Sequence, residues 1–312
     1  MNVSGHVNLT AGQVVGGRFL IEGRLGQGGF GSVYGALGLH TGRRCALKVE
    51  RGGRNALLRE LEVLSAVGGE GSVAPAPLEW WRLGNHSVLA MEAKGATVRG
   101  VNGSLAAVGV VMAGVLALLA ELHGRGFVHR DVKASNIVRG YPDDPRDARR
   151  LYLVDFGLAE RFRAPRGEHV PLREGVRPKG TFQYLSVRSH RQLLQSRRDD
   201  LESLAYMASV LLKGRLPWSF SSRRRPTHPK AARIKESRTH AVFSSCPRVF
   251  ADFLQYARGL EYAAEPDYAA WRQAFLHLGA RTDPHGVALH KCRMDVYRPH
   301  RRNTNTTRPI LN

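Results

Sequence analysis

The stretch Phe127-Val-His-Arg-Asp-Val-Lys-Ala-Ser-Asn136 determines how the rest of this chain is interpreted. It places an acid, Asp131, shortly before a cation, Lys133, and an amide, Asn136. Phosphoryl transfer needs these three groups: an acid to meet a hydroxyl, a positive charge beside the moving phosphate and an oxygen ligand for a metal ion. An acid near an asparagine is common by chance, so support must come from elsewhere in the chain.

A glycine-rich turn lies far upstream of this stretch. A strand is predicted at 18–22, the chain then reads Gly26-Gln-Gly-Gly-Phe-Gly31, and further strands are predicted at 32–34 and 43–49. Because a strand rather than a helix follows the glycines, the turn does not fit a dinucleotide-binding fold. Taken alone it is best explained as a plain β-hairpin turn, but in this context we interpret it as a flap whose backbone N–H groups approach phosphates. The residues expected to contact a nucleotide there are Gly26, Gln27, Gly28, Gly29, Phe30, Gly31 and Val33.

A lysine, Lys48, ends the third predicted strand. On its own it would be explained as an edge-strand lysine that faces solvent. The residues after it predict a helix at 55–67, because apolar side chains recur there at helical spacing. Two acids on this helix, Glu60 and Glu62, are candidates to pair with Lys48.

Further elements are predicted from periodicity and turn residues. Residues 105–120 carry no charge and imitate a membrane span, but a span needs about 20 apolar residues with basic flanks, so we predict a buried helix. Asp155-Phe-Gly157 follows a predicted strand. The other predicted strands lie at 78–83, 87–91 and 151–154, and the other predicted helices at 198–212, 249–262 and 268–278.

The bulk composition fits a large intracellular domain. The chain has 312 residues, of which 43% are hydrophobic, so it can bury a substantial core. Its three cysteines are scattered and indicate neither a disulfide framework nor a zinc site, which favours a reducing compartment, the cytoplasm or the nucleus. Residues 1–10 do not have the pattern of a signal peptide. The formal net charge of +21 predicts attraction to phosphate, nucleic acid or acidic protein segments.

The order of these motifs resembles that of a protein kinase. The resemblance implies an α+β, two-lobed fold in residues 16–280. The N-lobe, at about 16–92, is expected to hold an antiparallel sheet and one helix, and the C-lobe, at about 95–280, to be mainly helical. Residues 1–15 and the basic tail at 281–312 are expected to be flexible.

The same resemblance assigns roles at the site, with ATP and Mg²⁺ as cofactors. Asp131 is expected to accept or orient the hydroxyl proton of the substrate, and Lys133 to neutralise the γ-phosphate. Lys48 is expected to hold the α and β phosphates, paired with Glu60 rather than Glu62 because an aliphatic pair follows Glu60 in the register of the kinase helix. The expected metal ligands are Asn136 and Asp155, and the expected adenine contacts are Ala46, Met91 and Glu92, the last two in the link between the lobes.

Three later runs narrow the resemblance to the casein kinase I superfamily, which includes the vaccinia-related and tau-tubulin kinases. They are Gly180-Thr-Phe-Gln-Tyr-Leu-Ser186, Ser196-Arg-Arg-Asp-Asp-Leu-Glu-Ser-Leu204 and Gly214-Arg-Leu-Pro-Trp218. The similarity extends from about residue 18 to residue 278, and Leu185-Ser-Val187 stands where most other kinases have Ala-Pro-Glu.

This narrower resemblance implies a serine/threonine protein kinase. The position of Lys133 two residues after Asp131 supports that choice, as does Thr181, which is placed to hydrogen-bond both of them. Asp200 is expected to cap the backbone of the catalytic loop from the central helix.

Regulation and substrate choice are predicted from what the activation segment contains. Between Gly157 and Thr181 the sequence has no hydroxyl-bearing residue, so we expect activity without phosphorylation there and no regulatory role for Arg130. Gln183 stands where casein kinase I usually has an anion-binding arginine. The nearby run at 223–235, which includes Arg223, Arg224, Arg225 and Lys230, is either a replacement site for acidic or pre-phosphorylated protein substrates, a nuclear-import signal, a nucleic-acid patch or plain solvated surface.

Two other classes of function compete with a kinase. A pseudokinase scaffold would lack an essential residue, but Lys48, Asp131, Asn136 and Asp155 are all present. A nucleic-acid-binding protein would interleave aromatic residues with its basic run, and residues 221–235 contain none. We expect a monomer that acts on protein substrates and does not enter a membrane.

Overall fold

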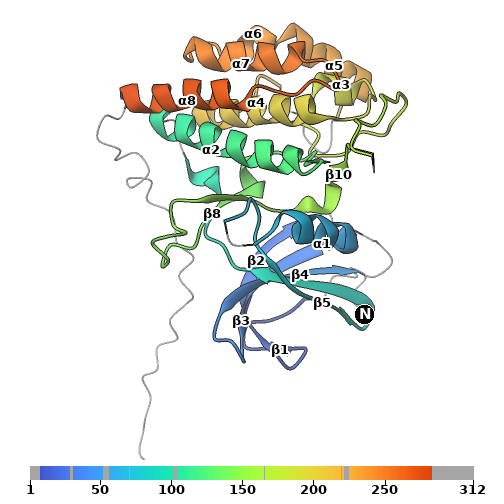
Figure 1. Ribbon diagram of the computed structural model, residues 1–312, viewed down its shortest axis with the longest axis vertical. Helices are drawn as coiled ribbons and strands as arrows, with labels where there is room; N and C mark the ends of the chain where they lie inside the picture. The colour runs from blue at the N-terminus through green and yellow to red at the C-terminus, as the bar shows by residue number, and fades with distance from the viewer. Residues whose placement is uncertain are drawn as a thin grey trace, which may run out of the picture.

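The computed structural model describes residues 8–28, 31–51, 56–69, 71–101, 104–164, 166–218, 220 and 225–282. A curled antiparallel sheet with one helix forms the N-terminal lobe, and helices form most of the C-terminal lobe (Figure 1). The predicted two-lobed α+β architecture is confirmed. The sheet has the strand order β1-β2-β3-β4-β6-β5. Its strands are β1 (Val14–Val15), β2 (Phe19–Gly28), β3 (Gly31–Gly38), β4 (Arg44–Arg51), β5 (Pro77–Leu83) and β6 (His86–Glu92).

The N-terminal sheet is stabilised by apolar side chains on both of its faces. One face buries a cluster that includes Tyr34, Leu47 and Val88, while helix α1 (Ala56–Val67) packs Leu57 and Leu64 on the other side. The sheet begins earlier than the expected domain boundary at residue 16, because β1 pairs with β2 and the amide of Leu9 donates to the Tyr34 hydroxyl at 3.3 Å.

The C-terminal lobe is built around two buried helices. They are α2 (Leu105–Gly124) and α4 (Arg197–Lys213), with α8 (Tyr268–Thr282) lying along α2 on the side away from the sheet (Figure 1). Helix α2 is long and apolar enough to cross a membrane by length and composition, but most of it is buried inside the protein. The predicted buried helix is therefore confirmed, with its N-terminus capped by Ser104. Helix α7 (Arg248–Gly259) packs against α4.

Short elements complete this lobe and connect it to the site. The strands β7 (Phe127–Val128) and β10 (Glu160–Arg161) pair with each other, as do β8 (Ile137–Arg139) and β9 (Leu151–Leu153). The single-turn helices are η1 (Val98–Gly100), η2 (Ala134–Asn136) and η3 (Phe156–Leu158). The remaining helices are α3 (Val187–His190), α5 (His228–Ser237) and α6 (Thr239–Val242).

Helix α5 was not expected from the sequence, where residues 223–235 were interpreted as a basic run. Pro229 in its first turn suits a helix start, and Ala231 and Ala232 are buried against the rest of the lobe. Residues 228–235 of this run therefore belong to a helix with a buried face rather than to a uniformly solvated segment. Arg223 and Arg224, and the tail from residue 283, lie outside the described residues.

Candidate active site

The catalytic stretch identified in the sequence forms the loop between β7 and β8. Because β8 pairs with β9, the chain after β9 brings Asp155 beside this loop, and because β7 pairs with β10, Glu160 reaches the same place. Two short antiparallel pairs therefore bring together residues that lie far apart in the sequence.

Asp200, in the first turn of α4, caps the backbone at the start of this loop, as the sequence predicted. Its carboxylate accepts hydrogen bonds from the amides of His129 at 2.7 Å and Arg130 at 2.8 Å, and lies 2.9 Å from Nε2 of His123. Burial alone would raise the pKa of Asp200. The contact with His123 and the hydrogen bond from the His129 amide outweigh the effect of burial, so the pKa lies below its usual value. Arg130 has a φ of 66°, a left-handed conformation that these bonds stabilise.

Asp131 is fixed by three neighbours. Its Oδ1 accepts from the amide of Thr181 at 2.8 Å, and its Oδ2 accepts from Nζ of Lys133 at 2.6 Å. Lys133 also donates to the Thr181 hydroxyl at 2.8 Å. The side-chain Nδ2 of Asn136 donates to the backbone carbonyl of Asp131 at 3.0 Å. Acid, cation and amide are thus in one cluster, and the contact of Thr181 with both Asp131 and Lys133 is the one predicted.

Lys48 reaches from β4 to two carboxylates. Its Nζ lies 2.6 Å from Glu60 on α1 and 2.6 Å from Asp155. Burial alone would lower the pKa of Lys48, but the two carboxylates raise it above its usual value, and Lys48 in turn keeps the pKa of Asp155 below the usual range against the effect of burial. Glu62 faces solvent and pairs with Arg161 at 3.0 Å, so the structure places Glu60 and not Glu62 against Lys48.

The donor chemistry of Asn136 and Asp155 fits a magnesium ion. The bond from the Asn136 amide nitrogen to Asp131 defines which end of that amide is the oxygen. Asp155 has a φ of 68°, and its side chain keeps 32% exposure beside Lys48. An amide oxygen and a charged carboxylate are the ligand types that Mg²⁺ prefers, usually with phosphate and water oxygens.

The predicted nucleotide contacts share one face of the sheet. Val33 lies opposite Lys48 across β3 and β4, and Ala46 lies opposite Met91 across β4 and β6. Directly opposite residues in a sheet share a face, so all four side chains lie on the side of Lys48. The amide of Glu92, the last residue of β6, donates to the Ala76 carbonyl at 3.0 Å.

The tip of the glycine turn is only partly described. Strands β2 and β3 form a hairpin in which Gly28 pairs with Gly31, and Gly26 and Gln27 lie on β2. A Cβ at Gly31 would lie 2.1 Å from the Val49 carbonyl, so only glycine fits there. Gly29 and Phe30 lie outside the described residues.

Two contacts at the site were missed by the sequence interpretation. Arg130, expected to have no regulatory role, is buried and donates from Nε to the Leu158 carbonyl at 2.6 Å, while its NH2 lies 2.7 Å from Glu160. Lys235, counted as part of a basic run, is fully buried under residues 183–185. The spacing of residues in the sequence predicts neither the partners of Arg130 nor those of Lys235, because in both cases the partners belong to elements far away in the chain.

A comparison with protein families agrees with this geometry. The model of the protein kinase domain matches residues 19–258, which includes strands β2 to β6, α1 and the whole cluster around Asp131. The chain belongs to the protein kinase family. Membership supports a phosphotransferase that binds ATP and acts on protein substrates.

Proposed function

We propose that the protein is a serine/threonine kinase of the casein kinase I superfamily that depends on ATP and Mg²⁺. The observation that carries the proposal is the cluster of Asp131, Lys133 and Thr181, with all contacts between 2.6 and 2.8 Å. These contacts fix the three side chains relative to one another, as catalysis by positioning requires.

The roles of these residues follow from their chemistry. Asp131 accepts or orients the proton of a substrate hydroxyl, and Lys133 places a positive charge beside the phosphoryl group that moves to that hydroxyl. Lys48, kept in place by Glu60, binds the phosphates that remain with the nucleotide. Asn136 and Asp155 would hold Mg²⁺, which supplies neutralisation of phosphate charge when bound.

The residues of the superfamily resemblance occupy structural positions that support the narrower assignment. Ser186, which stands in the substituted Ala-Pro-Glu position, donates to Asp199 of α4. Glu202 of the same helix accepts from the Val187 amide at 3.1 Å and lies 3.0 Å from Nε of Arg258. The run at 196–204 therefore anchors the segment that follows the activation loop.

The surface around Phe182 favours acidic protein substrates. Arg225 lies over the Phe182 ring, with 4.9 Å from Cζ to the ring centroid. Burial lowers the pKa of the neighbouring His228, and the charges of Arg225 and Arg177 lower it further. These two exposed arginines supply the positive charge that Gln183 does not. We propose a monomeric enzyme of the cytoplasm or nucleus, whose basic face binds acidic or pre-phosphorylated segments.

The test is phosphate transfer from labelled ATP with Mg²⁺ to casein, followed by identification of the labelled amino acid. We expect phosphoserine and phosphothreonine, and a lower rate with a basic protein of similar size. Phosphotyrosine would refute the assignment of residue specificity. ATP binding without transfer would identify a scaffold, and salt-sensitive DNA binding in place of transfer would favour the nucleic-acid alternative.

A further inference from the structure

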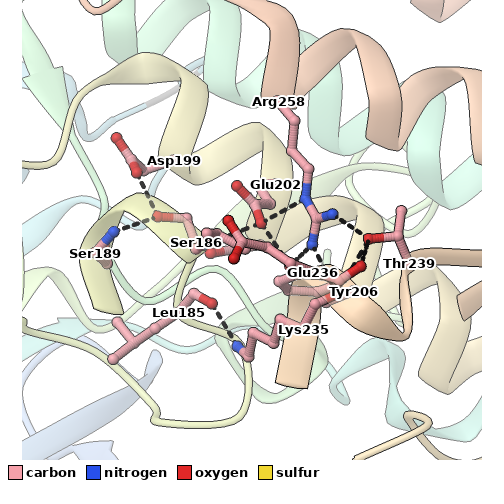
Figure 2. A network of polar contacts seen from close by, with 12 residues as sticks. Leu185, Ser186, Ser189, Asp199, Glu202, Tyr206, Lys235, Glu236, Thr239 and Arg258 are labelled. Carbon is pink, nitrogen blue, oxygen red and sulfur yellow. Dashed lines mark hydrogen bonds and ion pairs between the residues drawn. The ribbon is translucent and has the colours of Figure 1, made fainter. Parts of the chain in front are cut away.

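Lys235 of α5 is a buried cation with unusual partners. Its side chain is fully buried, and Nζ donates to the backbone carbonyls of Gln183, at 3.0 Å, and Leu185. Nζ also lies 4.8 Å from the ring centroid of Tyr206 and 5.1 Å from that of Trp218. Figure 2 shows Lys235 reaching Leu185 from beneath, beside Tyr206. In the described part of the chain, carbonyls and aromatic faces contact this charge, and no carboxylate does.

Charged groups farther away surround Lys235 without neutralising it. Glu202 of α4 lies close enough to raise its pKa, but Arg258 of α7 lowers it, and Glu202 is already engaged by Arg258 at 3.0 Å. On the side of α3 and the start of α5, burial lowers the pKa of His190 and His228, and the charge of Lys235 lowers both further; their ring nitrogens are 2.9 Å apart. Burial lowers the pKa of Lys235 to about 7. An apolar side chain at this position would avoid the cost of burying an amino group.

The group that Lys235 holds is the loop at 180–186, which we call the substrate loop. At one end of the loop Thr181 contacts Asp131 and Lys133. In its second half, Lys235 bonds the carbonyls on either side of Tyr184, and the Tyr184 carbonyl itself accepts from Ser203 at 2.8 Å. The path of the main chain is therefore set by side chains beneath it.

Tyr184 connects this support to the catalytic cluster. The amide of Tyr184 donates to the Thr181 carbonyl at 2.8 Å, so Tyr184 is bonded to the residue that contacts both Asp131 and Lys133. A shift of the backbone at Gln183 or Leu185 would move Tyr184, and with it the surface beside Asp131 on which a substrate hydroxyl must be placed.

We propose that Lys235 is a positioning residue for protein substrates: the N–H donors of its amino group clamp the substrate loop so that a bound segment is presented to Asp131. The proposal rests on the proposed function for its kinetic consequence, but the clamp itself is a structural property. Lys235 does not contact the reacting groups, and its effect passes through the loop.

The test compares Lys235→Met, which removes the N–H donors, with Lys235→Gln, whose amide retains two donors without the charge. Arg233→Met is the matched control, because Arg233 is an exposed cation on the same helix. The first measurement is amide hydrogen exchange. We expect Lys235→Met to accelerate exchange of the amides at 182–187 at least tenfold, with a smaller effect for Lys235→Gln and none for Arg233→Met. Unchanged exchange in Lys235→Met would overturn the clamp, and so would equal acceleration throughout the C-terminal lobe.

The second measurement is steady-state kinetics with casein. We expect Lys235→Met to raise the KM for casein about tenfold and to leave the KM for ATP within twofold of wild type, with Lys235→Gln recovering most of the loss. Equal increases in both KM values would contradict a role in substrate positioning. If the wild-type protein transfers no phosphate, the proposed function fails, whereas the exchange experiment still decides whether Lys235 holds the loop. If Lys235→Met does not fold, exchange in Lys235→Gln decides it: acceleration confined to the amides at 182–187 supports the clamp, and no acceleration, or equal acceleration throughout the C-terminal lobe, overturns it.

Discussion

Replacing Glu160 by glutamine should slow the enzyme without abolishing its activity. The carboxylate of Glu160 lies 2.7 Å from Arg130, the arginine that a phosphate on the activation segment would bind in a phosphorylation-switched kinase. It provides a permanent negative charge in a segment that has no hydroxyl. Arg130 is next to Asp131 in the sequence, so the loss of Glu160 as a partner of Arg130 should loosen the loop that carries the carboxylate of Asp131.

The size of the effect follows from burial. The side chain of Arg130 is 4% exposed and that of Glu160 is 48% exposed. Removing one partner of a fully buried pair costs about 3 to 5 kcal/mol, and an exposed pair contributes less than about 1 kcal/mol. This half-exposed pair lies between these limits, at about 1 to 2 kcal/mol, because Arg130 keeps its bond to the Leu158 carbonyl. We therefore expect a decrease in kcat of roughly 5- to 30-fold.

The assay is the initial rate of casein phosphorylation by enzyme that has been treated with phosphatase. Glu168→Gln is the control, because Glu168 is an exposed acid in the same segment. Wild type and Glu168→Gln should keep their activity after phosphatase treatment, and only Glu160→Gln should be slower. The reasoning is refuted if Glu160→Gln is as fast as wild type, or if phosphatase treatment alone inactivates the wild-type protein.

Three further predictions concern Lys48, Thr181 and Lys235. Lys48→Met leaves Glu60 buried without its cation, so the free energy of unfolding should fall by about 3 kcal/mol and ATP affinity should decrease, as measured by denaturant unfolding and calorimetry. Unchanged ATP affinity would contradict the assigned role. Thr181→Ala removes the hydroxyl contact with Lys133 and should lower kcat roughly tenfold, while Thr181→Ser should restore it; equal rates in all three proteins would remove this contact from the mechanism. For Lys235, burial lowers the pKa to about 7 from 10.5, so the unfolded chain binds more protons between these values and stability should rise with pH across that window. The difference in unfolding free energy between wild type and Lys235→Met should increase from pH 7 to 9 by on the order of 1 kcal/mol per pH unit, and a flat difference would contradict the lowered pKa of Lys235.

Much of the fold and the site could be predicted because their signals are local. Apolar periodicity located α1, α2 and α4, and motif spacing brought Asp131, Lys133 and Asn136 together on one loop. The pairing of Lys48 with Glu60 was predictable because helical register decides which acid faces the sheet, and Glu62 points to solvent accordingly.

The rest depends on packing between distant segments. Lys235 belongs to a run whose charge suggested solvent, and only the assembly of α5 against Tyr206 and Trp218 buries it. Glu160 meets Arg130 because β10 pairs with β7, a contact with no signature in the sequence. In both cases the sequence showed a charged residue but did not show which groups that residue would contact.

The most direct test of the central claim, that Asp131 serves phosphoryl transfer, is the transfer of labelled phosphate from ATP with Mg²⁺ to casein by wild type and by Asp131→Asn. Asparagine retains the shape of Asp131 and can still contact Thr181, but it cannot accept a proton from the substrate. We expect clear incorporation by wild type and a loss of about 10²- to 10⁴-fold in the variant, at equal ATP affinity and thermal stability within a few degrees. Equal incorporation by the two proteins would remove Asp131 from the mechanism and contradict the proposed function of the site.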